Sequence, residues 1–210
     1  MNTHYIKYTN PPNHGWIEYK LDPQEMDYVW KCIENKKELT KNFLAGNIDR
    51  SYNLIDRGRW FETNVIRPMC KIYSDKYGNL GDKAPNGVKH PYYMRDWWVN
   101  YQKQHEFNPL HNHSGVYSFV IWMNIPTSYE EQRKNPISSN SNSNAISNFQ
   151  MWYNTTTGEP STYTYGMFPE RAGMMLFFPA TMHHCVYPFY NCDEERITVS
   201  GNVLLNTTRK

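Results

Sequence analysis

The second half of the chain is divided into short segments that are rich in aromatic and β-branched residues and separated by turn residues. Such segments are typical of antiparallel β structure. Six of them predict strands, at residues 96–103, 114–125, 149–153, 173–178, 185–188 and 196–205. Six strands that follow a helical region predict a curled double sheet.

The first half of the chain follows a helical pattern instead. Asp22 can cap a helix, Pro23 suits its first position, and Glu25 completes a capping box. Apolar residues then recur at helical spacing, which predicts one helix that ends near Gly46 and a second over residues 62–77. The expected fold class is therefore α+β and mainly β, with the helices packed on one sheet.

We expect one domain over residues 1–210, in which residues 1–90 form a helical support and residues 91–210 form the β core. A polar loop of serine and asparagine interrupts that core at residues 134–148. Such a run cannot bury a core of its own, so it is interpreted as a solvated insertion. A lid over a functional site is the alternative.

Composition restricts the class of protein. Hydrophobic residues make up 39% of the chain and aromatic residues 16%, so large rings supply buried surface that aliphatic side chains do not. The formal net charge of +2 gives no electrostatic basis for nucleic-acid binding. No apolar stretch approaches the roughly 18 residues of a membrane span. We therefore expect a cytoplasmic protein that binds neither nucleic acid nor membrane.

Four histidines form two groups that have the spacing of metal ligands. His111 and His113 precede a predicted strand, and residues two apart in extended backbone point to the same side. His183 and His184 are adjacent, so at most one of them can face the first pair. Imidazole is a common ligand of iron, zinc, copper and nickel. The alternative is that these are loop histidines hydrogen-bonded to water or backbone.

Arg196 and Thr198 lie on the same face of an otherwise apolar predicted strand. A guanidinium in such a place needs an anion. Two interpretations remain open: a carboxylate clamp for a ligand, or an ion pair with a neighbouring acidic residue, Asp193, Glu194 or Glu195.

Three segments carry a family resemblance: the His111-x-His113 motif, residues 178–188 around His184, and residues 195–202 around Arg196. Together they resemble the Fe(II)/2-oxoglutarate-dependent oxygenases, in particular the small prolyl-hydroxylase-like members of bacterial and tailed-phage genomes. The resemblance covers about residues 96 to 205. It implies a double-stranded β-helix of the jelly-roll or cupin type, with Fe(II) and 2-oxoglutarate as cofactors, in a bacterial or phage-infected host cell.

The resemblance also implies roles for individual residues. His111 would be the first iron ligand and His184 the distal ligand, preferred over His183 because of its spacing from Pro179. Arg196, assisted by Thr198, would bind the distal carboxylate of 2-oxoglutarate.

Other residues are candidates for contacts around that site. Asn100 and Gln102 alternate on the preceding strand and can reach the same cavity, although they could equally be outward polar residues. Tyr117 follows the ligand pair closely enough to flank 2-oxoglutarate. The remaining aromatic residues nearby, Trp97, Trp98, Phe119 and Trp122, are expected to be core.

The sequence departs from the family pattern at one ligand. The family places Asp or Glu where this chain has His113, which leaves three neutral imidazoles as the ligand set. His113 can be the third ligand. Alternatively, Glu106 or a water molecule completes the site, and in the latter case His113 is free to bind substrate.

The resemblance implies a dioxygenase that hydroxylates an unactivated C–H bond, with O2 as co-substrate and release of succinate and CO2. Its substrate would be a prolyl or other protein side chain, or a small molecule. One alternative is a three-histidine cupin-like dioxygenase that does not use 2-oxoglutarate. Another is a non-enzymatic jelly-roll protein that binds metal or has a structural role. The sequence sets neither the substrate nor the oligomeric state.

Overall fold

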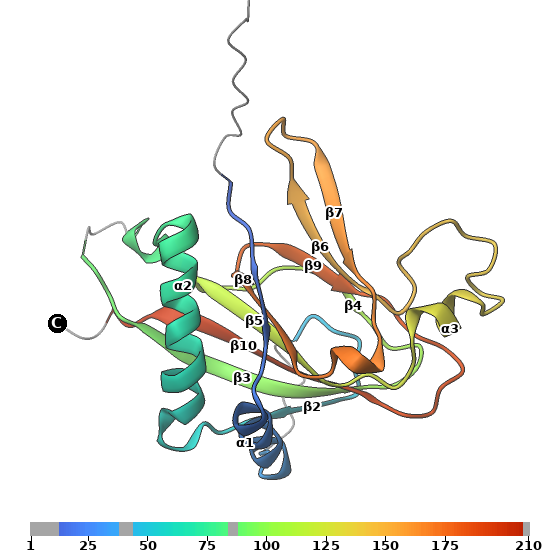
Figure 1. The fold of residues 1–210 in the computed structure, drawn as a ribbon, viewed down its shortest axis with the longest axis horizontal. Coiled ribbons are helices and arrows are strands. Elements are labelled where there is room, and N and C mark those ends of the chain that lie inside the picture. Colours follow the sequence, from blue (N-terminus) through green and yellow to red (C-terminus); the bar gives the residue numbers. More distant parts are fainter. Residues whose placement is uncertain (1–12, 38–43, 84–87, 208–210) are drawn as a thin grey trace, which may run out of the picture.

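The computed structural model describes residues 13–37, 44–83 and 88–207, and two antiparallel sheets dominate it (Figure 1). The large sheet has the strand order β1 (Ile17–Lys20), β8 (Met174–Pro179), β5 (Tyr117–Asn124), β10 (Arg196–Leu205), β3 (Tyr92–Gln102) and β2 (Arg50–Asn53). The small sheet has the order β4 (Asn108–His111), β9 (His183–Val186), β6 (Phe149–Asn154) and β7 (Pro160–Tyr165). The predicted mainly β, double-stranded β-helix class is confirmed.

Alternation along the strands creates two hydrophobic cores. In β5, Tyr117 and Ile121 face the helices, whereas Val120 and Trp122 face the small sheet. Because the side-chain period of a strand is two residues, one strand serves both cores. The helices therefore cover one face of the large sheet, and the other face borders the space between the two sheets.

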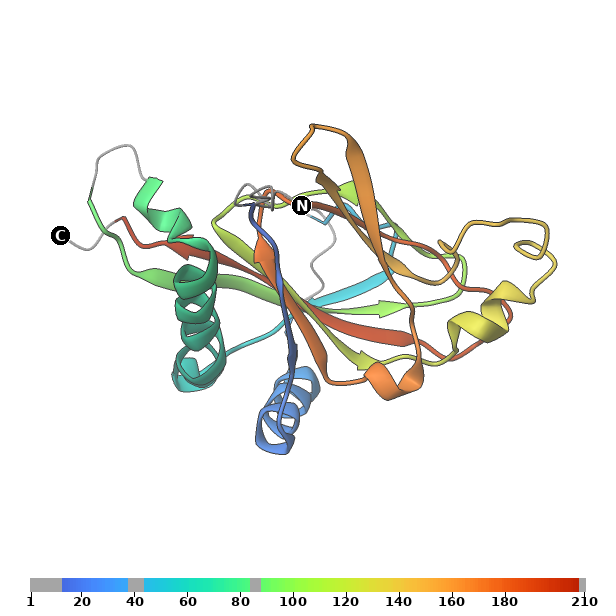
Figure 2. The ribbon, with the colours of Figure 1, turned by 45° about the horizontal axis from the view of Figure 1, so that its top comes forward.

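The helices α1 (Pro23–Glu34) and α2 (Arg67–Tyr77) lie on the outer face of the large sheet, away from the small one (Figure 2). A reciprocal pair of hydrogen bonds between Asp22 and Glu25 starts α1, which confirms the predicted capping box. None of the helices among the described residues is long and apolar enough to cross a membrane.

The prediction that the first helix continues to about Gly46 was wrong. It ends at Glu34 because Asn35 caps it, with both its backbone N–H and its side-chain amide donating to Lys31 O. Residues 44–46 are irregular, and Asn47 then pairs with Phe107 in a β-bridge. The predicted helical residues at 39 and 43 lie outside the described residues.

All six predicted strands are present, with ends shifted by a few residues. The strands and α-helix missed are β1, β2, β4, β7 and α3 (Tyr129–Arg133), and three short 3-10 turns were missed as well. Three of those strands have four residues, and β4 contains Pro109, which disfavours a strand prediction. Residues 1–90 are therefore not purely helical, because two strands of the large sheet come from them.

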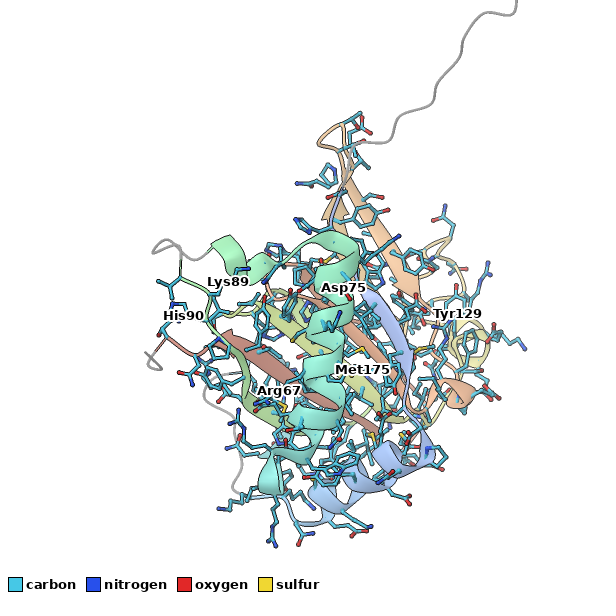
Figure 3. All side chains as sticks on the ribbon, turned by 60° about the vertical axis from the view of Figure 1, so that its left-hand side comes forward. Arg67, Asp75, Lys89, His90, Tyr129 and Met175 are labelled. Carbon is cyan, nitrogen blue, oxygen red and sulfur yellow. The ribbon has the colours of Figure 1, made fainter. Side chains whose placement is uncertain are left out.

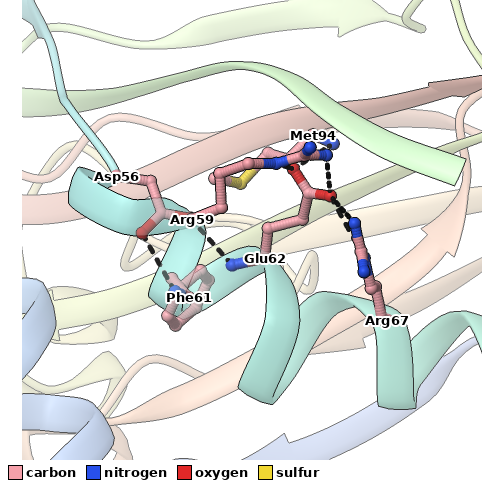
Figure 4. A network of polar contacts seen from close by, with 6 residues as sticks. All are labelled: Asp56, Arg59, Phe61, Glu62, Arg67 and Met94. Atoms are coloured by element: carbon pink, nitrogen blue, oxygen red, sulfur yellow. Dashed lines mark hydrogen bonds and ion pairs between the residues drawn. The ribbon is translucent and has the colours of Figure 1, made fainter. Parts of the chain in front are cut away.

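Glu62 ties the segment before α2 to the large sheet (Figure 4). The segment begins with a π-turn, Glu62–Ile66, and Pro68 follows in the first turn of α2. The Glu62 carboxylate is 3% exposed and accepts hydrogen bonds from Arg59, Arg67 and the backbone N–H of Met94 in β3. Burial alone would raise the pKa of Glu62, but the two guanidinium groups outweigh it and hold that pKa below its ordinary value.

Replacing Glu62 with glutamine is expected to lower the free energy of unfolding by about 2 kcal/mol, because buried donors lose a charged acceptor. Since the folded pKa of Glu62 is depressed, its contribution is complete above the ordinary carboxyl pKa of about 4.3 and is lost as the pH falls through the folded value. Urea unfolding from pH 7 down to about pH 3 measures this, because the loss falls below the ordinary carboxyl pKa; Asp56, Arg59 and Arg67 are the charged neighbours of the site.

Asp75→Asn is the matched control, because Asp75 lies on the open face of α2 (Figure 3) and its ion pair with Lys71 is exposed. Its replacement is expected to change the free energy of unfolding by less than about 0.5 kcal/mol. A Glu62→Gln effect no larger than this, or one that grows as the pH falls, would contradict the assignment.

Candidate metal and cofactor site

Three histidines meet at one edge of the small sheet. His111 is the last residue of β4 and pairs across the sheet with His184 of β9, while His113 follows two residues after β4. One possible ligand nitrogen from each ring lies within 4.8 Å of the other two. The Nε2 atoms of His113 and His184 are 3.3 Å apart. The structure thus brings the three predicted ligands together.

Backbone carbonyls orient two of these rings. Nδ1 of His111 lies 2.7 Å from Pro109 O, and Nδ1 of His184 lies 3.1 Å from Met182 O. A carbonyl can only accept, so each Nδ1 donates and each Nε2 keeps its lone pair. This is the arrangement in which ligating histidines are usually held.

A metal ion fits this set of donors. Burial lowers the pKa of His184 and lowers that of His113 to about 4, so the imidazoles are neutral. With its proton on Nε2, His113 donates to Nε2 of His184 across 3.3 Å; with its proton on Nδ1, both Nε2 lone pairs are available to one cation. Imidazole nitrogen is a good ligand for Fe(II) and its neighbours in the transition series.

His183 and Glu106 lie outside the histidine cluster. The side chain of His183 is exposed, whereas that of His184 is 5% exposed and packs against Phe149. The Glu106 carboxylate accepts hydrogen bonds from the backbone N–H groups of Asp49 and Lys103. Within the described residues no Asp or Glu joins the three histidines, so Glu106 does not supply the missing carboxylate.

A cavity of about 820 Å³ between the two sheets contains the histidine cluster. As expected, Asn100, Gln102 and Thr198 line it. Ser51 donates to the Asn100 side chain at 2.7 Å, and Ser118 donates to that of Asn202 at 2.8 Å, so two amides in the lining are fixed by serine hydroxyls. Further lining residues that the sequence reasoning missed include Leu44, Ala45, Gly46, Ser51, Asn53 and Asn202.

Arg196 lies beyond Thr198 on the same face of β10, and its side chain is completely buried. Its Nη2 atom donates to both O and Oγ of Ser147, at 2.7 and 2.6 Å, and its guanidinium lies over the Phe189 ring. Its Nη1 atom donates to Oε1 of Gln102 at 3.5 Å. Gln102 lines the cavity, whereas Arg196 lies behind it and does not.

The nearby acids do not neutralise Arg196. Glu195 pairs with Arg50, and Asp193 accepts a hydrogen bond from Gln104, so the predicted alternative of an ion pair with a neighbour is not formed within the described residues. Burial lowers the pKa of Arg196 to about 10, which still leaves it charged at neutral pH, and its Nε has no hydrogen-bond partner. A buried cation of this kind fits an anionic ligand group.

Tyr117 does not lie in the cavity, so its predicted contact with the cofactor was wrong. It packs against Tyr73 of α2 and Phe177 of β8, in the core under the helices. The alternation of β5 turns it away from the small sheet. Trp98 is buried, as expected, and it also lines the cavity, with its ring 6.1 Å from that of His113.

The opposite end of the cavity carries a β-bulge. Asn202 pairs with Asp96 and Val203 pairs with Met94, so Arg95 has no partner on β10. A bulge interrupts alternation and redirects a side chain. As a result, the adjacent residues Arg95 and Asp96 both line the cavity, where they form an ion pair that is partly exposed.

Comparisons with known proteins assign the chain to a family. The sequence profile of a 2OG-Fe(II) oxygenase family matches residues 96–202, about half of the chain, and the chain therefore belongs to the 2OG-Fe(II) oxygenases. The predicted cofactors, Fe(II) and 2-oxoglutarate, are those for which the family is named. A search of curated proteins finds no match.

Solved structures share the fold at low sequence identity. A 2OG-Fe(II) oxygenase family oxidoreductase from Burkholderia pseudomallei is 11% identical, with a TM-score of 0.53 over 90% of this chain and 85% of that one. A prolyl-4-hydroxylase from Pseudomonas putida is 13% identical, with a TM-score of 0.51 over 92% and 94%. HygX from Streptomyces hygroscopicus, solved with nickel, 2-oxoglutarate and hygromycin B, is 9% identical, with a TM-score of 0.51 over 92% and 84%.

Proposed function

We propose that the protein is a 2-oxoglutarate-dependent hydroxylase that acts on an unactivated C–H bond of a prolyl or other protein side chain. O2 is the co-substrate, and succinate and CO2 are released. The observation that carries this proposal is the pairing, in one fold, of three converging neutral imidazoles with a buried arginine that lacks an anion. These are the two fixed points that a metal and a dicarboxylate cofactor require.

Different residues of this chain bind the metal and the cofactor. His111, His113 and His184 hold the metal through Nε2, and the carbonyls of Pro109 and Met182 keep two of the rings in place. When bound, Fe(II) and 2-oxoglutarate supply the oxygen activation that the side chains of a protein cannot perform.

The other end of the site binds the cofactor and limits the access of water. Arg196 and the Thr198 hydroxyl hold the distal carboxylate of 2-oxoglutarate, and Asn100 is placed on the neighbouring strand to donate to the cofactor. Trp122, Phe149 and Phe178 form apolar walls that strengthen these electrostatic contacts.

His113 gives the site a charge different from that of the family pattern. Three neutral imidazoles leave the metal with its full +2 charge, whereas an Asp or Glu ligand would reduce it to +1. A more positive centre favours an anionic co-ligand, such as the carboxylate of a 2-oxoacid. In the alternative arrangement a water completes the ligand set and His113 contacts the substrate.

The substrate is expected at the bulged end of the cavity. Asp96 and Gln102 are six residues apart on β3, about 20 Å in extended backbone, and Trp98 with the neighbouring His113 lies between them. With 2-oxoglutarate at the Gln102 end, a substrate at the metal occupies the Trp98 and Arg95 end. The likeness in fold to a prolyl-4-hydroxylase supports a prolyl substrate.

A three-histidine dioxygenase that does not use 2-oxoglutarate is the second candidate, because the ligand set alone suits it equally well. It gives Arg196 no part at the metal site. A non-enzymatic metal-binding protein with this fold would consume no oxygen with any combination of cofactors.

Anaerobic reconstitution with Fe(II) tests the proposal. Addition of 2-oxoglutarate at about 100 times its Kd is expected to stabilise the metal-loaded protein by about 2.7 kcal/mol, which is a rise of several degrees in Tm. Exposure to O2 should then produce succinate without added substrate, at a slow uncoupled rate. If 2-oxoglutarate leaves the Tm of the iron-loaded protein unchanged, the proposed function is incorrect.

A further inference from the structure

Ser147 lies near the C-terminal end of the polar insertion, in a buried environment. The insertion was interpreted as solvated, yet Ser147 is completely buried. Its φ of 62° is in the left-handed region, where residues other than glycine are uncommon. Its N–H donates to Pro188 O at 3.0 Å, which attaches the end of the insertion to the segment between β9 and β10. Figure 1 shows the insertion and that segment at the same end of the sheets.

Ser147 offers two acceptors, its carbonyl and its hydroxyl oxygen, to one guanidinium nitrogen of Arg196. Nη2 carries two N–H bonds, one directed along each bidentate edge of the guanidinium. Ser147 O and Oγ accept from this nitrogen at 2.7 and 2.6 Å. Phe189 covers one face of the group, with 5.1 Å from Cζ to the ring centroid. Nη1 donates to Oε1 of Gln102 over a long 3.5 Å, and Nε has no hydrogen-bond partner among the described residues.

We propose that Ser147 is a positioning residue for the carboxylate clamp: it holds Nη2 so that Arg196 presents Nη1 toward Thr198 and the distal carboxylate of 2-oxoglutarate. This inference rests on the proposed function, because it takes Arg196 as the clamp. It assigns the insertion to recognition of the cofactor rather than to a lid. Because Ser147 already accepts from Nη2, the distal carboxylate binds Arg196 mainly through Nη1 and also accepts from the Thr198 hydroxyl. The contact with the arginine is therefore not bidentate.

Two substitutions distinguish the contribution of the Ser147 hydroxyl from that of its backbone conformation. Ser147→Ala removes Oγ and keeps the carbonyl acceptor, while Ser147→Gly also removes Oγ but suits the positive φ. Both are expected to weaken 2-oxoglutarate binding about tenfold, since a hydrogen bond to a charged group is lost. Ser147→Gly should lose less stability than Ser147→Ala, because glycine adopts the positive φ without strain. Ser139→Ala, an exposed serine of the same insertion, is the matched control and should bind 2-oxoglutarate like the original protein.

The Kd is measured by calorimetry on the anaerobic iron-loaded protein with two probes, 2-oxoglutarate and 2-oxobutanoate. The second probe is a 2-oxoacid that lacks the distal carboxylate. A positioning role predicts that the variants weaken 2-oxoglutarate binding and leave 2-oxobutanoate binding unchanged. Equal weakening of both probes, or of neither, would overturn the inference. Failure of the proposed function is distinguishable, because 2-oxoglutarate would then not bind the unsubstituted iron-loaded protein.

Discussion

Replacing His184 with alanine is expected to abolish tight metal binding and to reduce succinate production to background. His184 is the most buried of the three histidines, and its Nε2 lies 3.3 Å from that of His113. Its removal leaves two nitrogen ligands from adjacent backbone. Removal of a group that hydrogen-bonds to a metal ligand already lowers metal affinity about 10- to 100-fold. Removal of the ligand itself should therefore lower it at least about 100-fold. Equilibrium dialysis of the anaerobic protein with Fe(II) measures it.

His183→Ala is the control, because it removes a neighbouring imidazole that is exposed. This variant should bind iron with unchanged affinity. A small cavity next to Phe149 could destabilise His184→Ala, so circular dichroism must show that the metal-free variant is folded. The reverse result, in which His183→Ala loses iron and His184→Ala retains it, would place the ligand one residue earlier and refute this site.

Replacing Arg196 with glutamine is expected to weaken 2-oxoglutarate binding by about 100-fold or more while iron binding is retained. Loss of one partner from a buried charged contact typically costs 2–5 kcal/mol, or about 30- to several thousand-fold. Glutamine removes the charge but can still donate to Ser147, so the local fold has a substitute for one hydrogen bond. Calorimetric titration of the iron-loaded variant with 2-oxoglutarate measures the loss.

Arg95→Gln makes the same chemical change at the other end of the cavity, where the guanidinium is 43% exposed. It should leave the Kd of 2-oxoglutarate within about twofold. If Arg196→Gln binds 2-oxoglutarate normally and still turns over, the dioxygenase that does not use 2-oxoglutarate becomes the better description.

The sequence was informative where one local pattern determines a structure. Strand alternation points His111 and His113 to one side and allows at most one of His183 and His184 to join them, while the choice of His184 came from its spacing from Pro179 in the family pattern. The capping box of Asp22 is equally local. Such features need no knowledge of distant contacts.

Features that depend on distant contacts were not predictable in this way. Tyr117 was expected near the cofactor because of its place in the chain, but it packs on Tyr73 of α2, and which face of β5 the helices cover is set by distant contacts. The helical pattern was expected to continue to about Gly46, but Asn47 pairs with Phe107, which is distant in the sequence. Buried Ser147 lies in the most polar run of the chain, where composition indicates solvent exposure.

The two half-sites belong to different sheets: the histidines lie on or beside strands of the small sheet, and Arg196, Thr198 and Asn100 lie on the large one. The two halves share one core, and Arg196 contacts Ser147 and Phe189, which flank strands of the small sheet. In evolutionary terms, a change in the packing between the sheets therefore reaches both the metal ligands and the proposed clamp, so the two halves of the site are constrained to change together.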